Sequence, residues 1–182
     1  MRIVAGSWRG LTLIAPPGAT TRPTADRVRQ ALFDMLLHAP WGGRDTVAGA
    51  QVLDVFAGTG ACGLEALSRG AAHATFIERD QAALAALRAN IAACRAQDRG
   101  TVLAIDALAI PPGAEANLVF LDPPYSHDLV QRAMERLRAA GRLAPQALIV
   151  AETAHDEPIP TAFPLLAERT HGAARLSVWR EA

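Results

Sequence analysis

One tetrapeptide of the chain, Asp122-Pro123-Pro124-Tyr125, has residue types suited to chemistry on an amino group. It follows an apolar run, 117–121, that is typical of a buried strand. Two successive prolines fix an extended backbone and remove two N–H donors. The Asp122 carboxylate and the Pro123 carbonyl can then hold the two protons of an amino group, while Tyr125 stacks on an unpaired or flipped base. The alternative is a rigid turn after a strand, without a chemical role.

A glycine-rich loop, Gly58-x-Gly60-x-x-Gly63, follows a second apolar run at 51–56. Open α/β sheets bind ligands beyond the carboxyl ends of strands, near a helix N-terminus. Glycines let the backbone turn sharply and approach such a ligand closely. The spacing alone leaves two cofactor classes open, a dinucleotide and S-adenosylmethionine.

Carboxylates at strand ends favour S-adenosylmethionine. Asp54 lies inside a strand, where a carboxylate is costly unless a cation or hydrogen-bond donors meet it. The cofactor's ammonium group meets that need and a pyrophosphate does not. Glu78 ends the next strand, where an acid can hold both ribose hydroxyls of either cofactor. Asp106 follows the third strand and is either an adenine contact or a turn-forming residue.

The elements that must position these groups alternate along the chain. We expect strands at 51–56, 73–78, 101–105, 117–122 and 146–152, and helices at 61–69, 80–94 and 127–139. Such alternation requires crossover connections and predicts a mostly parallel sheet with helices on both faces. Two more strands, 164–169 and 174–180, form a C-terminal antiparallel pair. The result is an α/β fold with a Rossmann-like, seven-stranded sheet of the methyltransferase type.

Residues 1–45 are predicted to form a separate N-terminal arm, and residues 46–182 the catalytic domain. The runs 2–5 and 11–14 indicate a hairpin, and a helix capped by Thr24 follows a loop rich in proline and glycine.

The arm is basic although the whole chain has a net charge of zero. Residues 1–30 hold five arginines and one acid, Asp26, which leaves +4 there and −4 elsewhere. The chain contains no lysine, and guanidinium groups suit phosphate contacts and base stacking. A genomic composition bias explains more simply why the chain uses arginine instead of lysine. It does not explain why five arginines cluster in residues 1–30. The arginines of the arm are Arg2, Arg9, Arg22, Arg27 and Arg29.

Composition bounds the remaining possibilities. A chain of 182 residues with 51% hydrophobic residues can bury one full α/β core. No apolar run has the length of a membrane span or resembles a secretion signal, so we expect a soluble cytoplasmic protein. Cys62 and Cys94 lack metal-type spacing and are expected to be small buried residues, and we expect no metal.

Together these motifs resemble the bacterial small-subunit ribosomal RNA guanine 2-amino methyltransferases over nearly the whole chain. The most specific match is the run Arg22-Pro23-Thr24-Ala25-Asp26-Arg27-Val28-Arg29. The other matching segments are 1–6 with Arg9-Gly10, 54–67, 76–80, 122–125 and 172–180.

The resemblance implies transfer of a methyl group from S-adenosylmethionine to the exocyclic 2-amino group of a guanine in small-subunit ribosomal RNA, within an assembled or nearly assembled particle. The catalytic residues it implies are Asp122, Pro123 and Tyr125. The implied cofactor contacts are Asp54, Phe56, Gly58, Gly60, Glu78, Arg79, Asp106 and Ala107. The implied RNA contacts are Arg2, Trp8, Arg9, Arg22, Thr24, Arg27 and Pro124.

Three other hypotheses use part of the same sequence. An amino methyltransferase acting on DNA adenine or on a protein glutamine amide shares the tetrapeptide. A dinucleotide-dependent dehydrogenase is supported by the glycine spacing alone. An RNA-binding scaffold without catalysis is supported by the basic arm. In the arm itself, arginines that are merely solvated on a helix remain the alternative to RNA contacts.

Overall fold

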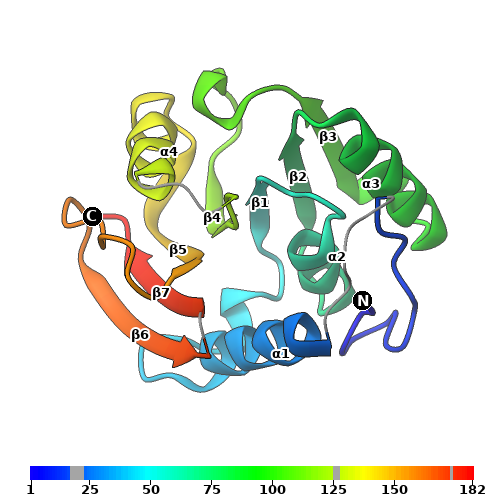
Figure 1. The fold of residues 1–182 in the computed structure, drawn as a ribbon, viewed down its shortest axis with the longest axis horizontal. Coiled ribbons are helices and arrows are strands. Elements are labelled where there is room, and N and C mark those ends of the chain that lie inside the picture. Colours follow the sequence, from blue (N-terminus) through cyan, green and yellow to red (C-terminus); the bar gives the residue numbers. More distant parts are fainter. Residues whose placement is uncertain (17–22, 125–127, 173) are drawn as a thin grey trace.

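The computed structural model describes residues 1–16, 23–124, 128–172 and 174–182. Helix α1 (Pro23–His38) and a short 3-10 turn, η1 (Arg44–Thr46), precede the sheet. The remaining elements alternate as expected (Figure 1), in the order β1 (Gln51–Val55), α2 (Ala61–Ser68), β2 (His73–Glu78), α3 (Gln81–Ala93), η2 (Gln97–Arg99), β3 (Gly100–Ala104), η3 (Ala107–Ala109), β4 (Ala116–Leu121), α4 (Leu129–Ala139), β5 (Leu143–Ala154), β6 (Leu165–His171) and β7 (Ala174–Arg180). No helix in these ranges is long and apolar enough to cross a bilayer.

The strands form one seven-stranded sheet in the order β3-β2-β1-β4-β5-β7-β6. Strands β1 to β5 are parallel, and β7 pairs antiparallel with both β5 and β6. The predicted fold class is therefore confirmed. The strand order reverses between β1 and β4, and open α/β sheets bind ligands at such a switch point.

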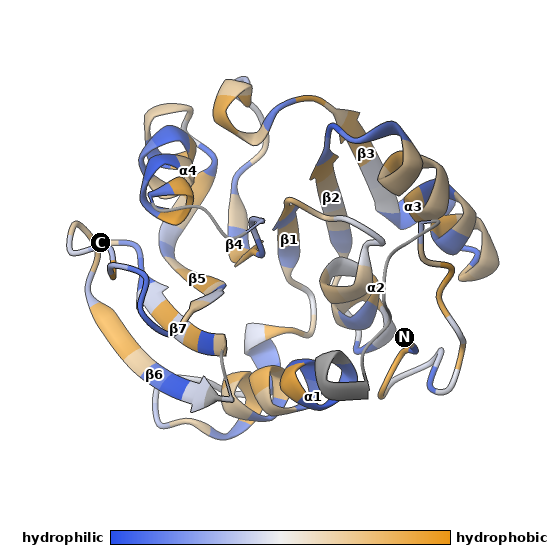
Figure 2. Cartoon of the chain, in the orientation of Figure 1, coloured by the Kyte–Doolittle hydropathy of each residue, from blue (hydrophilic) through white to orange (hydrophobic). Residues whose placement is uncertain are grey.

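Helices cover both faces of the sheet because alternate strand residues point to opposite sides. Val52 of β1 packs with α1, α2 and α3 in one hydrophobic core, while Leu53 and Val55 pack with α4 in another. Helix α4 places Val130, Ala133, Met134 and Leu137 at helical spacing on its buried side. Figure 2 shows its other side as hydrophilic.

The N-terminal segment forms the expected hairpin. Ile3 N donates to Leu11 O at 2.9 Å, and Gly10 N donates to Ile3 O at 2.9 Å. Ile3 and Leu13 are buried in the same core as α1 and α2. The arm thus shares its packing with the rest of the molecule, and its division from the catalytic domain at residue 45 stays a prediction about function.

Two sequence expectations about elements are wrong. Helix α1 begins at Pro23, so Thr24 lies in its first turn and does not cap its start. Proline suits that turn because its fixed φ matches a helix and its missing N–H would have no partner there. Strand β5 begins at Leu143, earlier than the expected start at residue 146. The sequence pattern places the start too late because Pro145 interrupts the apolar run. The strand is irregular at this point, where Gln146 has a φ of 62°.

A fully buried carboxylate, Glu65 of α2, joins the hairpin to the cofactor-side helix. It accepts hydrogen bonds from Val4 N at 2.7 Å and Ala5 N at 2.9 Å. Arg69 Nε donates to it at 2.8 Å, and Arg29 Nε lies 3.6 Å away. Two cations and two backbone donors together replace the water that this charge loses on burial.

We predict that Glu65→Ala lowers the free energy of unfolding by about 3–5 kcal/mol, because it leaves buried guanidinium and N–H groups without an acceptor. Urea denaturation followed by circular dichroism measures the change. The control is Glu135→Gln on the exposed side of α4, which we expect to change stability by less than about 0.5 kcal/mol. Equal stability of the two variants would contradict the structural role of Glu65.

Candidate active site

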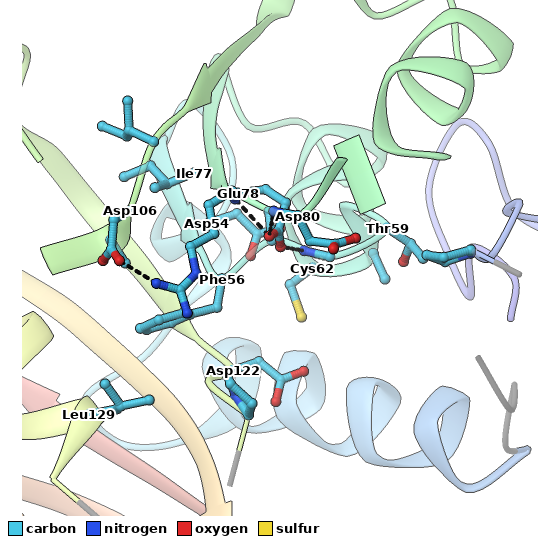
Figure 3. A pocket seen from close by; sticks show the side chains of 18 of the residues that line it. Asp54, Phe56, Thr59, Cys62, Ile77, Glu78, Asp80, Asp106, Asp122 and Leu129 are labelled. Atoms are coloured by element: carbon cyan, nitrogen blue, oxygen red, sulfur yellow. Dashed lines mark hydrogen bonds and ion pairs between the residues drawn. The ribbon is translucent and has the colours of Figure 1, made fainter. Parts of the chain in front are cut away.

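A pocket of about 640 Å³ lies beyond the carboxyl ends of β1, β2 and β4, at the switch point of the sheet (Figure 3). The glycine loop and the acid after β4 both line it. Of the residues expected to contact the cofactor, all but Gly60 line this pocket, namely Asp54, Phe56, Gly58, Glu78, Arg79, Asp106 and Ala107. The structure thus brings together residues from three separate segments of the chain, and Asp122 comes from a fourth.

Asp54 shapes the glycine loop from the end of β1. Its Oδ2 accepts a hydrogen bond from Gly63 N at 2.8 Å, so the carboxylate caps the first turn of α2. A side chain at Gly63 would lie 2.4 Å from Phe76 Cε1, which requires glycine there. Gly60 has a φ of 79°, a conformation that other residues rarely adopt. Gly60 therefore shapes the loop without lining the pocket.

Glu78 holds the other side of the loop. Its Oε2 accepts from Gly58 N at 2.9 Å, and its Oε1 accepts from Arg79 N at 2.7 Å and Asp80 N at 2.8 Å. Phe56, which lines the pocket between these segments, has a φ of 60°. A non-glycine residue in this region is strained, and such strain concentrates at functional sites.

Asp106 forms the turn that was one of the two alternatives expected of it. Its Oδ1 accepts from Leu108 N at 2.8 Å, so it forms the turn that begins η3. Its Oδ2 pairs with the Arg79 guanidinium, and both residues line the pocket. The bond from Leu108 N and the Arg79 contact lower the pKa of Asp106, which keeps it ionised.

The tetrapeptide begins where β4 ends. Strand β4 pairs with β1, and Asp122 N donates to Val55 O at 3.4 Å, so Asp122 and Asp54 lie at adjacent strand ends. Asp122 and Pro124 line the pocket, whereas Pro123 is buried behind it. Tyr125 lies outside the described residues.

Burial and like charges shift two of these carboxyls. Desolvation raises the pKa of Asp54 to about 8, and repulsion from Asp122 and Glu78 adds to the shift, while the bond from Gly63 opposes it. Desolvation, followed by repulsion from Glu152, raises the pKa of Asp122 to about 7, although this residue is exposed by surface area. Asp122 remains accessible from the pocket, so protons and solvent reach it. A positive ligand would relieve both shifts.

The charges lining the pocket distinguish the two cofactor classes. Among the described residues that line it, the acids are Asp54, Glu78, Asp80, Asp106 and Asp122, against one guanidinium, that of Arg79. S-adenosylmethionine carries an ammonium and a sulfonium group, which such a pocket attracts. A dinucleotide pyrophosphate would meet excess negative charge instead. The residues present therefore fit S-adenosylmethionine better than a dinucleotide.

Of the expected RNA contacts that the structure describes, only Pro124 lines this pocket. Arg9 and Arg27 are exposed, and Arg2 has 70% of its side-chain area exposed. Trp8 is half-buried, with the Arg99 guanidinium 5.2 Å from its ring centroid. Arg22 and the side chain of Thr24 lie outside the described part of the chain.

Arg29, one of the five arginines of the basic arm, is buried and does not present its charge to a partner. Its side chain is 4% exposed and binds Asp26 and the carbonyl oxygen of Arg2. Its guanidinium also faces the buried Glu65. Arg29 therefore stabilises the junction of the hairpin, α1 and α2, and cannot reach a phosphate.

Sequence reasoning missed two residues of this region. Cys62, expected to be a buried packing residue, lines the pocket, and its sulfur points toward the side where Asp122 lies (Figure 3). Cys62 lies two residues after Gly60, in the first turn of the helix that follows the glycine loop. This position could have indicated that its side chain meets the pocket. Glu152 of β5 acts on Asp122 by repulsion. It follows the rule that identified Asp54 and Glu78, an acid at the carboxyl end of a parallel strand.

Comparison with known proteins gives a consistent result. A family described as conserved hypothetical protein 95 matches residues 1–180. The chain belongs to this family. It is 43% identical over 163 residues to ribosomal RNA small subunit methyltransferase D of Escherichia coli, covering 88% of this chain and 78% of that protein. The corresponding protein of Haemophilus influenzae is 36% identical over 179 residues, covering 94% and 89%.

A solved structure agrees over the full chain. The Escherichia coli protein yhhF, a proposed methyltransferase, has a TM-score of 0.86 and 38% identity, covering 100% of this chain and 97% of that one. The fold, the pocket and the relatives together identify the chain as an S-adenosylmethionine-dependent methyltransferase of this family. The dehydrogenase and scaffold hypotheses are not favoured.

We predict that Asp54→Asn stabilises the protein at high pH and weakens cofactor binding. The folded-state pKa of about 8 exceeds the unfolded value of 3.8, so this carboxyl costs stability as pH rises through that interval. The variant's melting temperature should therefore exceed that of the wild type increasingly from pH 5 to 9, by about 2–4 °C for each kcal/mol. Differential scanning calorimetry measures it.

The same variant should bind S-adenosylhomocysteine about 10–100-fold more weakly in isothermal titration calorimetry, because a charge-assisted contact to the ammonium group is lost. Asp45→Asn, a change of an exposed acid in η1, is the control for both measurements. A melting-temperature difference that does not vary with pH would contradict the raised pKa of Asp54. An undiminished affinity for S-adenosylhomocysteine would contradict its contact with the cofactor.

Proposed function

We propose that this protein methylates the exocyclic 2-amino group of a guanine in small-subunit ribosomal RNA. The observation that carries the proposal is the shared pocket of the glycine loop and Asp122, at adjacent ends of β1 and β4. The printed names of the relatives support the RNA substrate. The structure contains no second domain that would recognise duplex DNA within the described residues, and the glutamine amide and adenine alternatives gain no separate support.

Asp122 is the proposed proton acceptor. A base amino group is a poor nucleophile, because its lone pair is conjugated with the ring. When bound, S-adenosylmethionine supplies an electrophilic methyl group. The Asp122 carboxylate can accept a hydrogen bond from the amine, orient its lone pair and take up the proton released after the N–C bond forms. A pKa of about 7 suits this role, because a base works best when its pKa lies near the working pH.

The neighbouring residues have proposed positioning roles. The carbonyl of Pro123 is the second acceptor for the amine, and Pro124 and Tyr125 contact the base. A base must leave its stack to enter a pocket at the edge of the sheet. Positioning of the amine close to the reacting carbon supplies a large share of the rate enhancement of such transfers.

The exposed cations of the hairpin and α1 are the proposed RNA contacts. Arg2, Arg9 and Arg27 present guanidinium groups to solvent, and Trp8 offers a ring for stacking. The small subunit, or a late intermediate of its assembly, is the proposed partner, which places the reaction in the cytoplasm. Residues 1–45 act in this proposal as the RNA-facing arm and residues 46–182 as the catalytic domain.

A methyl-transfer assay tests the substrate. Small subunits from cells that lack this protein should accept radiolabelled methyl groups on one guanine, located by mass spectrometry of RNA fragments. Asp122→Ala should lower kcat by about 10²–10⁴-fold, the usual contribution of a general base. Its affinity for S-adenosylhomocysteine should stay close to that of the wild type. Transfer to duplex DNA but not to small subunits would reject the substrate, and full activity of the variant would reject the role of Asp122.

The two shifted carboxyls predict a pH dependence. The ionised form of Asp54 binds the cationic cofactor, and the ionised form of Asp122 accepts the proton. The kcat/KM for S-adenosylmethionine should therefore rise as pH increases through about 7 to 8. The midpoint of the corresponding rise in kcat should lie at a lower pH than that of kcat/KM, because a bound cation stabilises both carboxylates. Steady-state kinetics from pH 5.5 to 9 measure both profiles. A kcat/KM that is flat across this range would contradict the shifts.

A further inference from the structure

One side chain joins the hairpin of residues 1–14 to the glycine loop of the cofactor pocket. Asn90 of α3 is fully buried. Its Oδ1 accepts from Ile14 N at 2.7 Å, and its Nδ2 donates to Ile14 O at 2.9 Å and to Thr59 O at 3.0 Å. Both amide protons are therefore used, one toward the hairpin and one toward the loop. Residue 59 lies between Gly58 and Gly60, where the loop meets the pocket.

The other strand of the hairpin is attached to α2, the helix that begins directly after the glycine loop. Ser68 Oγ accepts from Trp8 N at 3.0 Å and donates to Ala5 O at 2.6 Å. Glu65 binds the N–H groups of Val4 and Ala5. Both strands of the hairpin are thus held by the two helices, α2 and α3, that flank the cofactor loop.

The hairpin meets the pocket at one end and solvent at the other. Met1, the first residue of this segment, and Pro16, two residues beyond its other end, line the cofactor pocket. At the opposite end Arg9 is exposed, and Trp8 carries the stacked Arg99 guanidinium. A ring stacked with a guanidinium beside a further free arginine suits contact with bases and phosphates.

The Thr59 carbonyl is a part of the loop that can reorient easily. Gly58 and Gly60, on either side of it, have φ values of 54° and 79°, and glycines exchange such conformations at little cost. The bond from Asn90 fixes one orientation of this carbonyl and, through the same amide, the position of Ile14. A ligand that orders the loop must therefore also order the hairpin, and the effect is reciprocal.

We propose that Asn90 is a positioning residue that couples the cofactor loop to the RNA-facing hairpin, so that binding of cofactor and binding of RNA strengthen each other. The inference rests on the proposed function in one respect, the assignment of the hairpin as an RNA contact. It assigns no chemical step to Asn90, which is fully buried and does not line the cofactor pocket.

The coupling is measured as a ratio of affinities. The Kd of S-adenosylhomocysteine is determined without and with saturating small subunits, for the wild type and for Asn90→Leu, which removes the hydrogen bonds at similar side-chain size. We expect at least about a fivefold tightening in the wild type, the lower end of typical coupling, and a ratio near one in the variant. The matched control is Asn117→Leu, because Asn117 binds Gln51 N at the opposite edge of the sheet.

A purely structural role for Asn90 would weaken both affinities and leave their ratio unchanged. An unchanged ratio in Asn90→Leu, or a lost ratio in Asn117→Leu, therefore overturns the proposal.

Hydrogen exchange on the wild type provides a second test that needs neither RNA nor a folded variant. Exchange of the Ile14 amide, bound by Asn90, should slow severalfold when S-adenosylhomocysteine is added. Unchanged exchange at saturating ligand overturns the proposal. Slowed exchange without methyl transfer to small subunits would instead support the link between loop and hairpin and reject the proposed substrate.

Discussion

Repulsion among carboxylates at one edge of the sheet is the constraint on which the site depends. Each of the five parallel strands brings an acid to its carboxyl end or just beyond it, and these acids are Asp54, Glu78, Asp106, Asp122 and Glu152. Backbone donors offset part of the repulsion, since Gly63 N binds Asp54 and Gly58 N binds Glu78. Loss of water is the main cause of the raised pKa values of Asp54 and Asp122, and the repulsion that remains adds to it. The edge is thereby suited to a positive ligand, and the loop that receives this ligand is shaped by the same acids.

Sequence reasoning located the sheet and most of the pocket because both follow from local patterns. Alternating apolar runs and amphipathic helices set the parallel order, and acids at strand ends meet at one edge whatever the loops between them do. Cys62 and Glu152 escaped for a different reason. Their roles depend on which face of α2 meets the pocket and on how β5 lies beside β4, and both are properties of tertiary packing. Pro145 similarly concealed the true start of β5.

The basic arm shows where counting charges fails. The sequence pattern places five arginines in residues 1–30 and does not separate them by function. In the structure Arg29 is buried against Asp26 and Glu65, while Arg9 and Arg27 are exposed. The two kinds of arginine have opposite functions, since one kind fixes the arm to the core and the other is free to meet a partner. Only the position of Glu65, far away in the sequence, distinguishes them, and a local pattern does not contain that information.

The hairpin's attachments also constrain how the protein can fold during its own synthesis. The acceptor for the N–H of Val4 lies 61 residues further along the chain, and the acceptor for the N–H of Ile14 lies 76 residues further. The hairpin is translated before both of its docking sites, which lie in α2 and α3, the helices of the first two crossovers of the sheet. The segment must therefore remain undocked while these helices are translated, at roughly 5–20 residues per second. Its two short apolar runs, each interrupted by glycine or a polar residue, limit how strongly it can bind elsewhere in that interval.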